Sequence, residues 1–440
     1  MITYLFEFIL IILFNLFQNV EIIIPFNSSL SKIPKNLTHR DFMDSLITNK
    51  LVTNINIGTP PQNFDFLLDF DSYLTSVLKE DNNNKKNKRF NENNSTTFNY
   101  LGEKEYFYNL NFFSAINASD LITINDEISN FNCTFLHISD FTPSTNTKFP
   151  GVIGLGVITN GQPIHEEAGL IYQFKQKKII NNYNYTLVFN KNDFNGKIII
   201  EKNIYKNYSI EYFMKDYCIV TVSYNYYWGW NHVNSYLDSE PLEIKNLYFK
   251  PELGVIITNS EIKDILKEKF FDKKIKEGKC YEDYKIYTYF YCDKDVKINV
   301  GKFIFKKNKK GIEFYLDSKD LIIEYNNKIF FLMVFGRLSS DEAYFGYPFF
   351  KKFDVIFDQG TRNVGFYNIT VNDNNKEVNE DKEKIYEKYE NKNNIIKILF
   401  PFLIFICVLF GLYYLFYLYR KIKRKSNERL YEELNETTND

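Results

Sequence analysis

The sequence predicts a largely antiparallel all-β protein that carries one membrane-spanning helix near its carboxyl terminus. Between residues 48 and 370, short apolar runs such as LVTNINIG, FDFLLDF, CIVTVSY and DVIFD alternate with turn signals, a pattern typical of β-strands. One helix-like stretch, 260–274, interrupts these runs. The run 398–419 contains no charged side chain and is long enough to cross a bilayer as a helix.

The composition supports a large globular protein and argues against a nucleic-acid partner. The chain has 440 residues, of which 45% are hydrophobic, enough to form a large core or two lobes. With 54 basic and 55 acidic residues, the formal net charge is −1, so no overall field attracts a polyanion. The four histidines are scattered and no cysteine pair has a metal-binding spacing, so we expect neither metal nor cofactor.

The amino terminus resembles a targeting segment. Residues 3–17 are apolar and too short for a typical membrane span, so 1–20 are interpreted as a secretory signal peptide. The first residues lack Lys and Arg, and Glu7 interrupts the apolar stretch. An uncleaved membrane anchor therefore remains the alternative.

The carboxyl terminus predicts a single-pass type I membrane protein. A polar, charged stalk at 371–397 precedes the predicted span 398–419, and a basic cluster beginning at Arg420 follows it. Because basic residues favour the cytosolic side, 420–440 form a cytosolic tail. The bulk of the chain then lies in the lumen of the secretory or endosomal pathway or outside the cell. Within the tail, Tyr431–Leu434 has the form of a sorting-adaptor signal.

The cysteines and the glycosylation tripeptides fit a lumenal ectodomain. Cys280 and Cys292 bracket a Tyr-rich, strand-like stretch, and we predict a disulfide between them. Pairing of Cys133 with Cys218 stays open, because it depends on the fold. Acceptor tripeptides for N-glycosylation are present at Asn27, Asn36, Asn94, Asn117, Asn132, Asn184, Asn207 and Asn368.

Several segments, in the same order along the chain, resemble the pepsin-like aspartic peptidases (peptidase family A1). They are LVTNINIGTPPQNFDFLLDFDS at 51–72, FNENNSTTF at 90–98, FPGVIGLG at 149–156, YTLVFNKNDFNGKIIIE at 185–201 and FGYPFFKKFDVIFDQGTRNVGF at 345–366. The resemblance implies a bilobal all-β fold with a cleft between an amino-terminal lobe, 48–196, and a carboxy-terminal lobe, 197–370. Residues 20–26 (VEIIIPF) resemble the start of the family's inhibitory prosegment, so 21–47 are interpreted as a prosegment-like segment.

The resemblance also implies a catalytic site that needs one aspartate from each lobe. Two close carboxyl groups share a proton and activate a water, one acting as base and the other as acid. Asp69 matches the first aspartate and Ser72 its usual hydrogen-bond partner, while Phe70 and Asp71 depart from the family's Asp-Thr-Gly-Ser signature. Tyr108 matches the flap tyrosine that closes over bound peptide.

The second aspartate is expected at the end of an apolar strand, and the matching strand is LGVIITN at 253–259. This register places Ile257 at the aspartate position, followed by Thr258 as a substrate-binding residue, so the site would have lost one carboxyl group. Two other acids could replace the missing aspartate, but neither is favoured. Asp358 lies in the family's closing segment, and the side chain of Asp71 is expected to diverge from that of Asp69 in an extended loop.

The sequence therefore leaves three functions open. The first is a non-catalytic relative whose inter-lobe cleft binds a peptide or protein. The second is an atypical, active aspartic endopeptidase that uses Asp69. The third is a structural surface glycoprotein with a vestigial cleft. By resemblance the chain belongs with the aspartic-type endopeptidases, and the missing second aspartate favours an inactive member.

Overall fold

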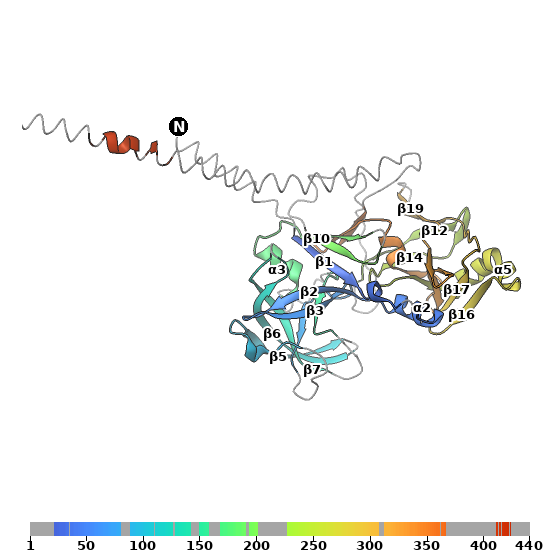
Figure 1. Cartoon of the computed structure of the whole chain (residues 1–440), viewed down its shortest axis with the longest axis horizontal. Helices are drawn as coiled ribbons and strands as arrows, with labels where there is room; N and C mark the ends of the chain where they lie inside the picture. Colours follow the sequence, from blue (N-terminus) through green and yellow to red (C-terminus); the bar gives the residue numbers. More distant parts are fainter. Residues whose placement is uncertain are drawn as a thin grey trace, which may run out of the picture. The chain divides into compact units, whose positions relative to one another are not determined.

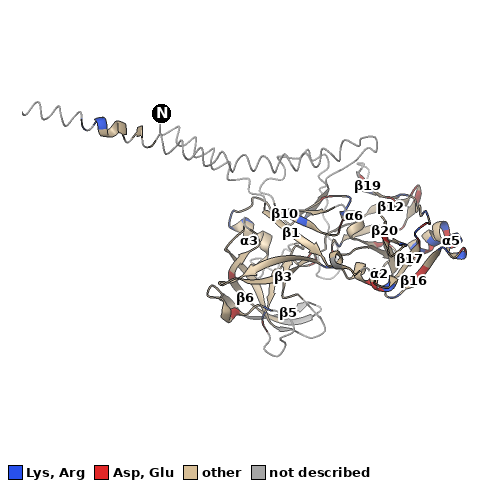
Figure 2. Ribbon diagram, in the orientation of Figure 1, with Lys and Arg blue, Asp and Glu red and all other residues tan. Residues whose placement is uncertain are grey.

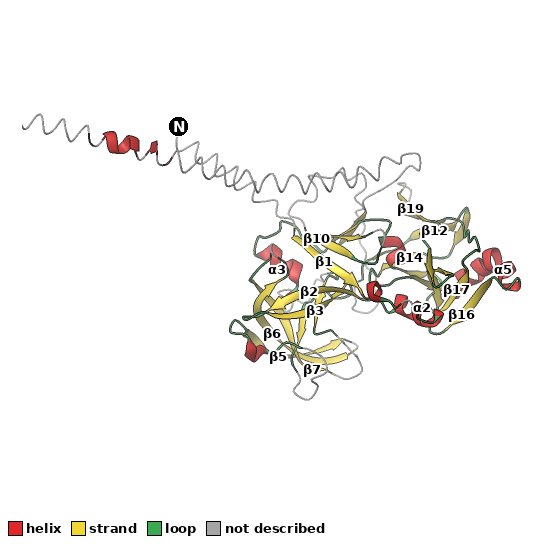
Figure 3. Ribbon diagram, viewed as in Figure 1, coloured by secondary structure: helices red, strands yellow, loops and turns green. Residues whose placement is uncertain are grey.

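The computed structural model describes 22–34, 36–80, 89–109, 111–125, 128–141, 149–157, 168–190, 193–200, 227–307, 312–360, 362–366 and parts of 411–423. By contacts between residues, the chain forms two units, 1–369 and 370–440. The first unit contains all the described strands and most of the described helices (Figure 1). It is mostly β, as the sequence predicts (Figure 3).

A sheet that joins both lobes runs through the first unit. Among the described residues it has twelve strands. Their order is β25 (Asn363–Phe366), β24 (Val355–Asp358), β9 (Asn184–Phe189), β10 (Gly196–Ile200), β1 (Ile22–Ser28), β2 (Leu51–Ile57), β3 (Gln62–Asp69), β8 (Gly151–Gly154), β4 (Ser76–Leu78), β7 (Phe131–Phe141), β6 (Asn111–Thr123) and β5 (Asn99–Asn109).

Two further sheets form the carboxy-terminal lobe. Within the described part of this lobe, the larger contains β11 (Gly229–Trp230), β14 (Asn246–Phe249), β23 (Glu342–Phe345), β15 (Ile256–Asn259), β22 (Met333–Gly336), β17 (Thr288–Asp293), β21 (Lys328–Phe331) and β20 (Ile322–Tyr325), with β16 (Cys280–Tyr284) paired to β17. The smaller contains β13 (Glu240–Leu242), β12 (Val233–Leu237), β18 (Phe303–Lys307) and β19 (Ile312–Leu316).

Alternation of side chains explains why these segments form strands. In β1, Ile22, Ile24 and Phe26 are at most 2% exposed, while Pro25 and Asn27 point to solvent. Since successive side chains of a strand point to opposite faces, one face of each strand is buried in the core. The segment that resembles a prosegment thus contributes a strand to the middle of the largest sheet, between β10 and β2.

Short helices cover the sheets. They are η1 (Ser29–Lys32), α2 (His39–Ile47), η2 (Glu92–Asn94), α3 (Leu170–Gln176), α4 (Ser260–Leu266), the π-helix η5 (Lys267–Phe271), α5 (Asp272–Lys276) and α6 (Tyr347–Phe350). The helix predicted over 260–274 is confirmed as the continuous series α4, η5 and α5. Basic and acidic residues gather on α5 (Figure 2), which agrees with a helix face open to water.

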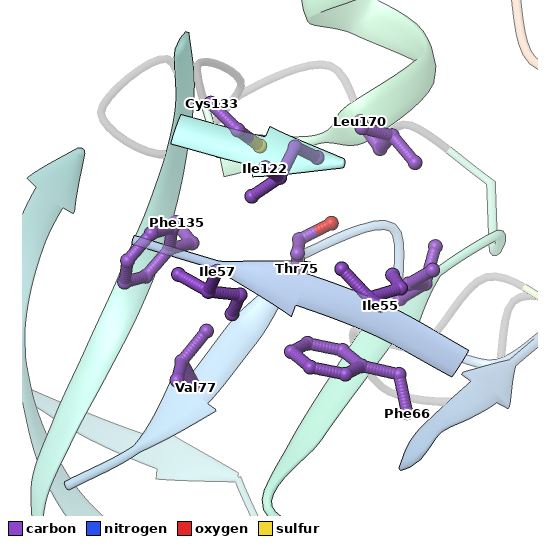
Figure 4. A pocket seen from close by; sticks show the side chains of 10 residues that line it. Ile55, Ile57, Phe66, Thr75, Val77, Ile122, Cys133, Phe135 and Leu170 are labelled. Carbon is purple, nitrogen blue, oxygen red and sulfur yellow. The ribbon is translucent and has the colours of Figure 1, made fainter. Parts of the chain in front are cut away.

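The core of the amino-terminal lobe contains a small apolar cavity (Figure 4). Its lining comes from β2, β3, β4, β6, β7, β8 and α3, and Thr75 contributes a hydroxyl group to it. The lining residues are Ile55, Ile57, Phe66, Thr75, Val77, Ile122, Cys133, Phe135, Ile153 and Leu170. Because nearly all of them are apolar, the cavity is a packing defect rather than a polar binding site.

The disulfide between Cys280 and Cys292 is confirmed and links β16 to β17. Cys133 is a buried free thiol, and Cys218 lies outside the described residues. Asn184 is fully buried in β9, so its side chain cannot carry a glycan in this fold. Asn207 and Asn368 are outside the described residues.

The predicted signal peptide, stalk and sorting signal also lie outside the described residues, as does most of the predicted span. No helix in the described part of the chain is both long enough and apolar enough to cross a membrane.

Candidate ligand site where the two lobes meet

Asp69 ends strand β3 and opens a tight turn. The strand pairs in parallel with β8, which places Asp69 beside Gly154, and the Leu155 N–H donates to the Asp69 carbonyl at 2.7 Å. The backbone N–H of Asp71 donates to Asp69 Oδ1 at 2.9 Å. Burial, and then the nearby charge of Asp71, raise the pKa of Asp69 above its ordinary value, although the backbone N–H groups and Lys250 oppose this.

The carboxy-terminal lobe repeats this strand arrangement. In the amino-terminal lobe, β3 pairs in parallel with β8, and β4 pairs antiparallel with the same strand at Ser76↔Val152. In the other lobe, β14 pairs in parallel with β23 up to Phe249↔Phe345, and β15 pairs antiparallel with it at Ile257↔Tyr344. The two lobes are thus built on one plan.

This correspondence identifies the residue that mirrors Asp69. Asp69 lies opposite Gly154, and Ser76 lies opposite the residue two places before that glycine. In the carboxy-terminal lobe the residue after Phe249 is Lys250, which comes opposite Gly346, and Ile257 lies opposite the residue two places before Gly346. Lys250 therefore mirrors Asp69, and Ile257 mirrors Ser76.

The sequence register that placed Ile257 at the second catalytic position differs from this pairing by seven residues. Ile257 lies in β15, 5% exposed, in an apolar cluster with Met43 and Leu46 of α2. Thr258, expected to bind substrate, is 0% exposed, and its hydroxyl has no hydrogen-bond partner among the described residues. The structure therefore does not bring Thr258 to an open surface.

Lys250 joins the two lobes by an ion pair. Its Nζ contacts Oδ1 of Asp71, in the turn that Asp69 opens. The Lys250 side chain is 13% exposed and that of Asp71 is 42% exposed, so the pair lies at the edge of solvent. The Lys250 ammonium also lies 4.5 Å from the centre of the Tyr227 ring, within the range of a cation–π interaction.

Glu252 adds a third carboxyl group to the site. It mirrors Asp71, since both residues lie two places after the paired positions Lys250 and Asp69. Its Oε2 atom is buried and has no hydrogen-bond partner in the described part of the chain. Burial raises the pKa of Glu252 to about 7; Lys250 lowers it, while Asp71 and Asp69 raise it. Near neutral pH this carboxyl group is therefore only partly ionised.

The other residues that the sequence analysis singled out lie partly in the site and partly around it. Ser72 belongs to the Asp69 turn, and its hydroxyl accepts the Leu74 N–H at 3.1 Å. The Phe70 ring is buried, 6.1 Å from the Phe357 ring. Tyr108 lies in the β5–β6 hairpin, where it pairs with Phe112.

Asp358 belongs to the joining sheet. It ends β24, pairs with Asn184 of β9, and accepts the Gly360 N–H at 2.9 Å. The neighbouring Gln359 side chain donates to the Gly156 carbonyl at 2.7 Å, which ties the closing segment to the amino-terminal lobe. These contacts place Asp358 within the sheet that joins the lobes.

The site combines one ammonium group with three carboxyl groups. The described residues contain no group of three His, Cys, Asp or Glu side chains that could hold a metal ion. At the two mirrored positions the chemistry is an acid and a cation, so no proton can be shared between two carboxyl groups there. Sequence reasoning missed Lys250 and Glu252, because neither has the residue type that the family signature requires.

These features define a mostly β protein that is consistent with the fold of the pepsin-like peptidases and has an altered pair of central loops. The chain belongs to the eukaryotic aspartyl protease family, whose model matches residues 50–369, more than half of the sequence. No curated protein is similar enough to the chain to be matched to it. The family's fold implies that peptide or protein segments bind between the lobes.

Proposed function

We propose that this protein is a non-catalytic member of the family that binds a peptide or protein segment between its lobes. The observation that supports this is the strand register that makes Lys250 the counterpart of Asp69 in the carboxy-terminal lobe. The family's reaction needs a carboxyl group there, to share a proton and to act as the acid. A lysine ammonium that is paired with Asp71 supplies no such partner.

Binding does not depend on the lost chemistry. A peptide held between two lobes gains affinity from backbone hydrogen bonds and apolar contacts, which need neither catalytic carboxyl group. Loss of one core group from a catalytic unit can lower the rate by a factor of roughly 10⁴ or more. The same change leaves the walls of the cleft in place.

The proposal includes a membrane anchor. The apolar run 398–419, followed by the basic cluster that begins at Arg420, supports a single span with the tail in the cytosol. The bound peptide or protein would then lie in the lumen or outside the cell, and Tyr431–Leu434 would be available to a sorting adaptor.

An acidic peptidase assay on the full-length chain tests the proposal, with Asp69→Ala as the matched control. We expect no difference in peptide cleavage between the two proteins, and peptides from a random library retained by both. Cleavage by the parent chain that disappears in Asp69→Ala would contradict a non-catalytic role.

A second candidate function, an atypical active endopeptidase, rests on Glu252. One of its carboxyl oxygens, Oε2, is buried; the group interacts electrostatically with Asp69, and its pKa is raised to about 7. Groups with such shifted pKa values gather at catalytic sites. In this case cleavage would be lost in both Asp69→Ala and Glu252→Gln, so adding the second variant to the same assay decides between the two functions.

A further inference from the structure

We propose that residues 22–50 are a permanent part of the folded domain and are not released by proteolysis. This differs from the role that their resemblance to a removable prosegment suggests. The inference concerns the assembly of the domain and holds whether or not the cleft binds peptide. Three independent sets of contacts carry it.

The first set is the position of β1 within the joining sheet. Residues 22–26 pair with β10 from Ile22↔Ile200 to Phe26↔Gly196, and Asn27 and Ser28 pair with β2. Removing β1 would leave β10 and β2 with unpaired backbone groups and an open apolar face. In the described part of the chain, only three residues separate α2 from β2, too few to form a substitute strand.

The second set is the packing of α2 on the carboxy-terminal lobe. Phe42, Met43 and Leu46 are at most 3% exposed and belong to one apolar cluster with strands β15, β17, β21 and β22. The Phe42 ring stacks on the Tyr325 ring with 4.0 Å between centres. Figure 1 shows α2 beside β16 and β17.

Charged groups add to this contact. Arg40 of α2 forms an ion pair with Asp283 at 2.8 Å, and Asp44 pairs with Lys285. Tyr325 accepts the Leu37 N–H at 2.9 Å and donates its hydroxyl to the Pro34 carbonyl at 2.6 Å. The helix is therefore fastened by apolar, ionic and hydrogen-bonding groups together.

The third set centres on Asn49, which is 1% exposed. Its Oδ1 accepts hydrogen bonds from the hydroxyl groups of Ser28 at 2.6 Å and Ser29 at 2.9 Å. Its Nδ2 donates to the backbone carbonyl of Glu252 at 2.8 Å. One buried side chain thus connects the end of β1 to the loop that follows Lys250.

The same loop touches the segment at a second point. The Gly254 N–H donates to the Leu46 carbonyl at 2.8 Å, and a side chain at Gly254 would collide with Leu46 and Leu30. Residues 22–50 are thus a supporting wall for the loop Pro251–Gly254. We infer that the loop keeps its conformation only with this wall in place, so the site is formed without an activating cleavage.

A nicked protein tests the inference. A protease recognition sequence is inserted between Thr48, which is exposed at the end of α2, and Asn49 in the full-length chain. After cleavage we expect the amino-terminal fragment to co-elute with the rest of the chain in gel filtration at pH 5 and pH 7, and to separate only in denaturant. Release of the fragment from a remainder that stays folded would overturn the proposal.

Two substitutions in the nicked protein measure the contribution of the wall. Ile24→Ala, in the buried face of β1, is expected to weaken retention of the fragment by a factor of at least about 30. Asn36→Ala, at an exposed position of the same segment, is the matched control and is expected to change retention less than about twofold. Equal, small effects of both substitutions would contradict the role of β1.

Peptide mapping of the intact protein is a test that needs no insertion. The full chain is expressed in secretory cells, and the purified protein is digested and analysed by mass spectrometry. We expect peptides from 22–50 in the same amount as peptides from 51–80. A mature chain that begins after residue 50 would overturn the inference.

Discussion

At the scale of single residues, a buried polar group that lacks a hydrogen-bond partner lowers the stability of this fold. Thr75 is 5% exposed, and its hydroxyl has no hydrogen-bond partner among the described residues. The side chain lines the apolar cavity of the amino-terminal lobe (Figure 4). A buried hydroxyl that makes no hydrogen bond lowers stability, because it has lost its contacts with water.

We therefore expect Thr75→Val to raise the free energy of unfolding by about 1 kcal/mol. Urea unfolding of the two proteins measures the difference. Thr96→Val is the control, and we expect it to lower the free energy of unfolding, because the exposed Thr96 hydroxyl donates to the Thr59 carbonyl at 3.1 Å. A lower stability for Thr75→Val would show that the hydroxyl has a partner in solution, such as a bound water.

At the scale of elements, helix α4 depends on its first turn. The Asn259 side chain accepts the N–H groups of Glu261 at 2.9 Å and Ile262 at 3.1 Å, and donates to the Ser340 carbonyl at 2.7 Å. The residue is 2% exposed. It therefore serves both as the cap of the helix and as a link to the loop before β23.

We expect Asn259→Ala to cost about 2 kcal/mol of stability, the upper end of the range for a helix cap, because a buried link is lost as well. Thermal unfolding followed by circular dichroism measures the loss. Thr38→Ala removes the exposed cap of α2 and is expected to cost about 1 kcal/mol. Equal losses for the two variants would argue against a role for the Ser340 contact.

The helices and strands also show which parts of the fold can be predicted from the sequence. The β-rich fold, the helix over 260–274 and the disulfide follow from local patterns, and all three are present. The register of the second central loop does not follow, since LGVIITN has the apolar pattern of the strand that normally ends at the aspartate. Only the pairing of Phe249 with Phe345, far apart in the chain, identifies β14 as that strand. Because a lysine stands where the family has its aspartate, the sequence around Lys250 contains no local motif that would reveal this pairing.

Across the whole molecule, two buried groups give opposite dependences of stability on pH. Burial lowers the pKa of His137 to about 4, although the nearby Glu92 acts in the opposite direction. The other charged or titratable groups next to His137 are Lys79 and Tyr100. From pH 6.5 down to about 4, the unfolded chain then binds more protons, so stability falls with acid. Glu252, with a pKa raised to about 7, does the reverse: stability falls as pH rises from 4.5 to 7.

We expect the two effects to offset each other between about pH 4.5 and 6.5 in the parent chain. In Glu252→Gln only the His137 effect should remain, so that the free energy of unfolding rises by up to about 3 kcal/mol from pH 4 to 6.5. His137→Phe should leave the Glu252 effect, so that stability falls as pH rises over the same range. Urea unfolding at several pH values distinguishes them; identical pH profiles for both variants would refute the assignment.

The joining sheet has a consequence for synthesis on the ribosome. It brings together strands from the beginning, middle and end of the domain: β1 pairs with β10, and β9 pairs with β24, which ends at Asp358. The first strand cannot find its main partner until residue 200 has been made, and the sheet cannot be completed until residue 366 has left the exit tunnel. Until then the nascent chain presents the apolar stretch Ile22–Phe26 unpaired. An unpaired apolar strand of this kind is prone to aggregate, so we expect translation of the domain to be the stage at which it most needs protection from other chains.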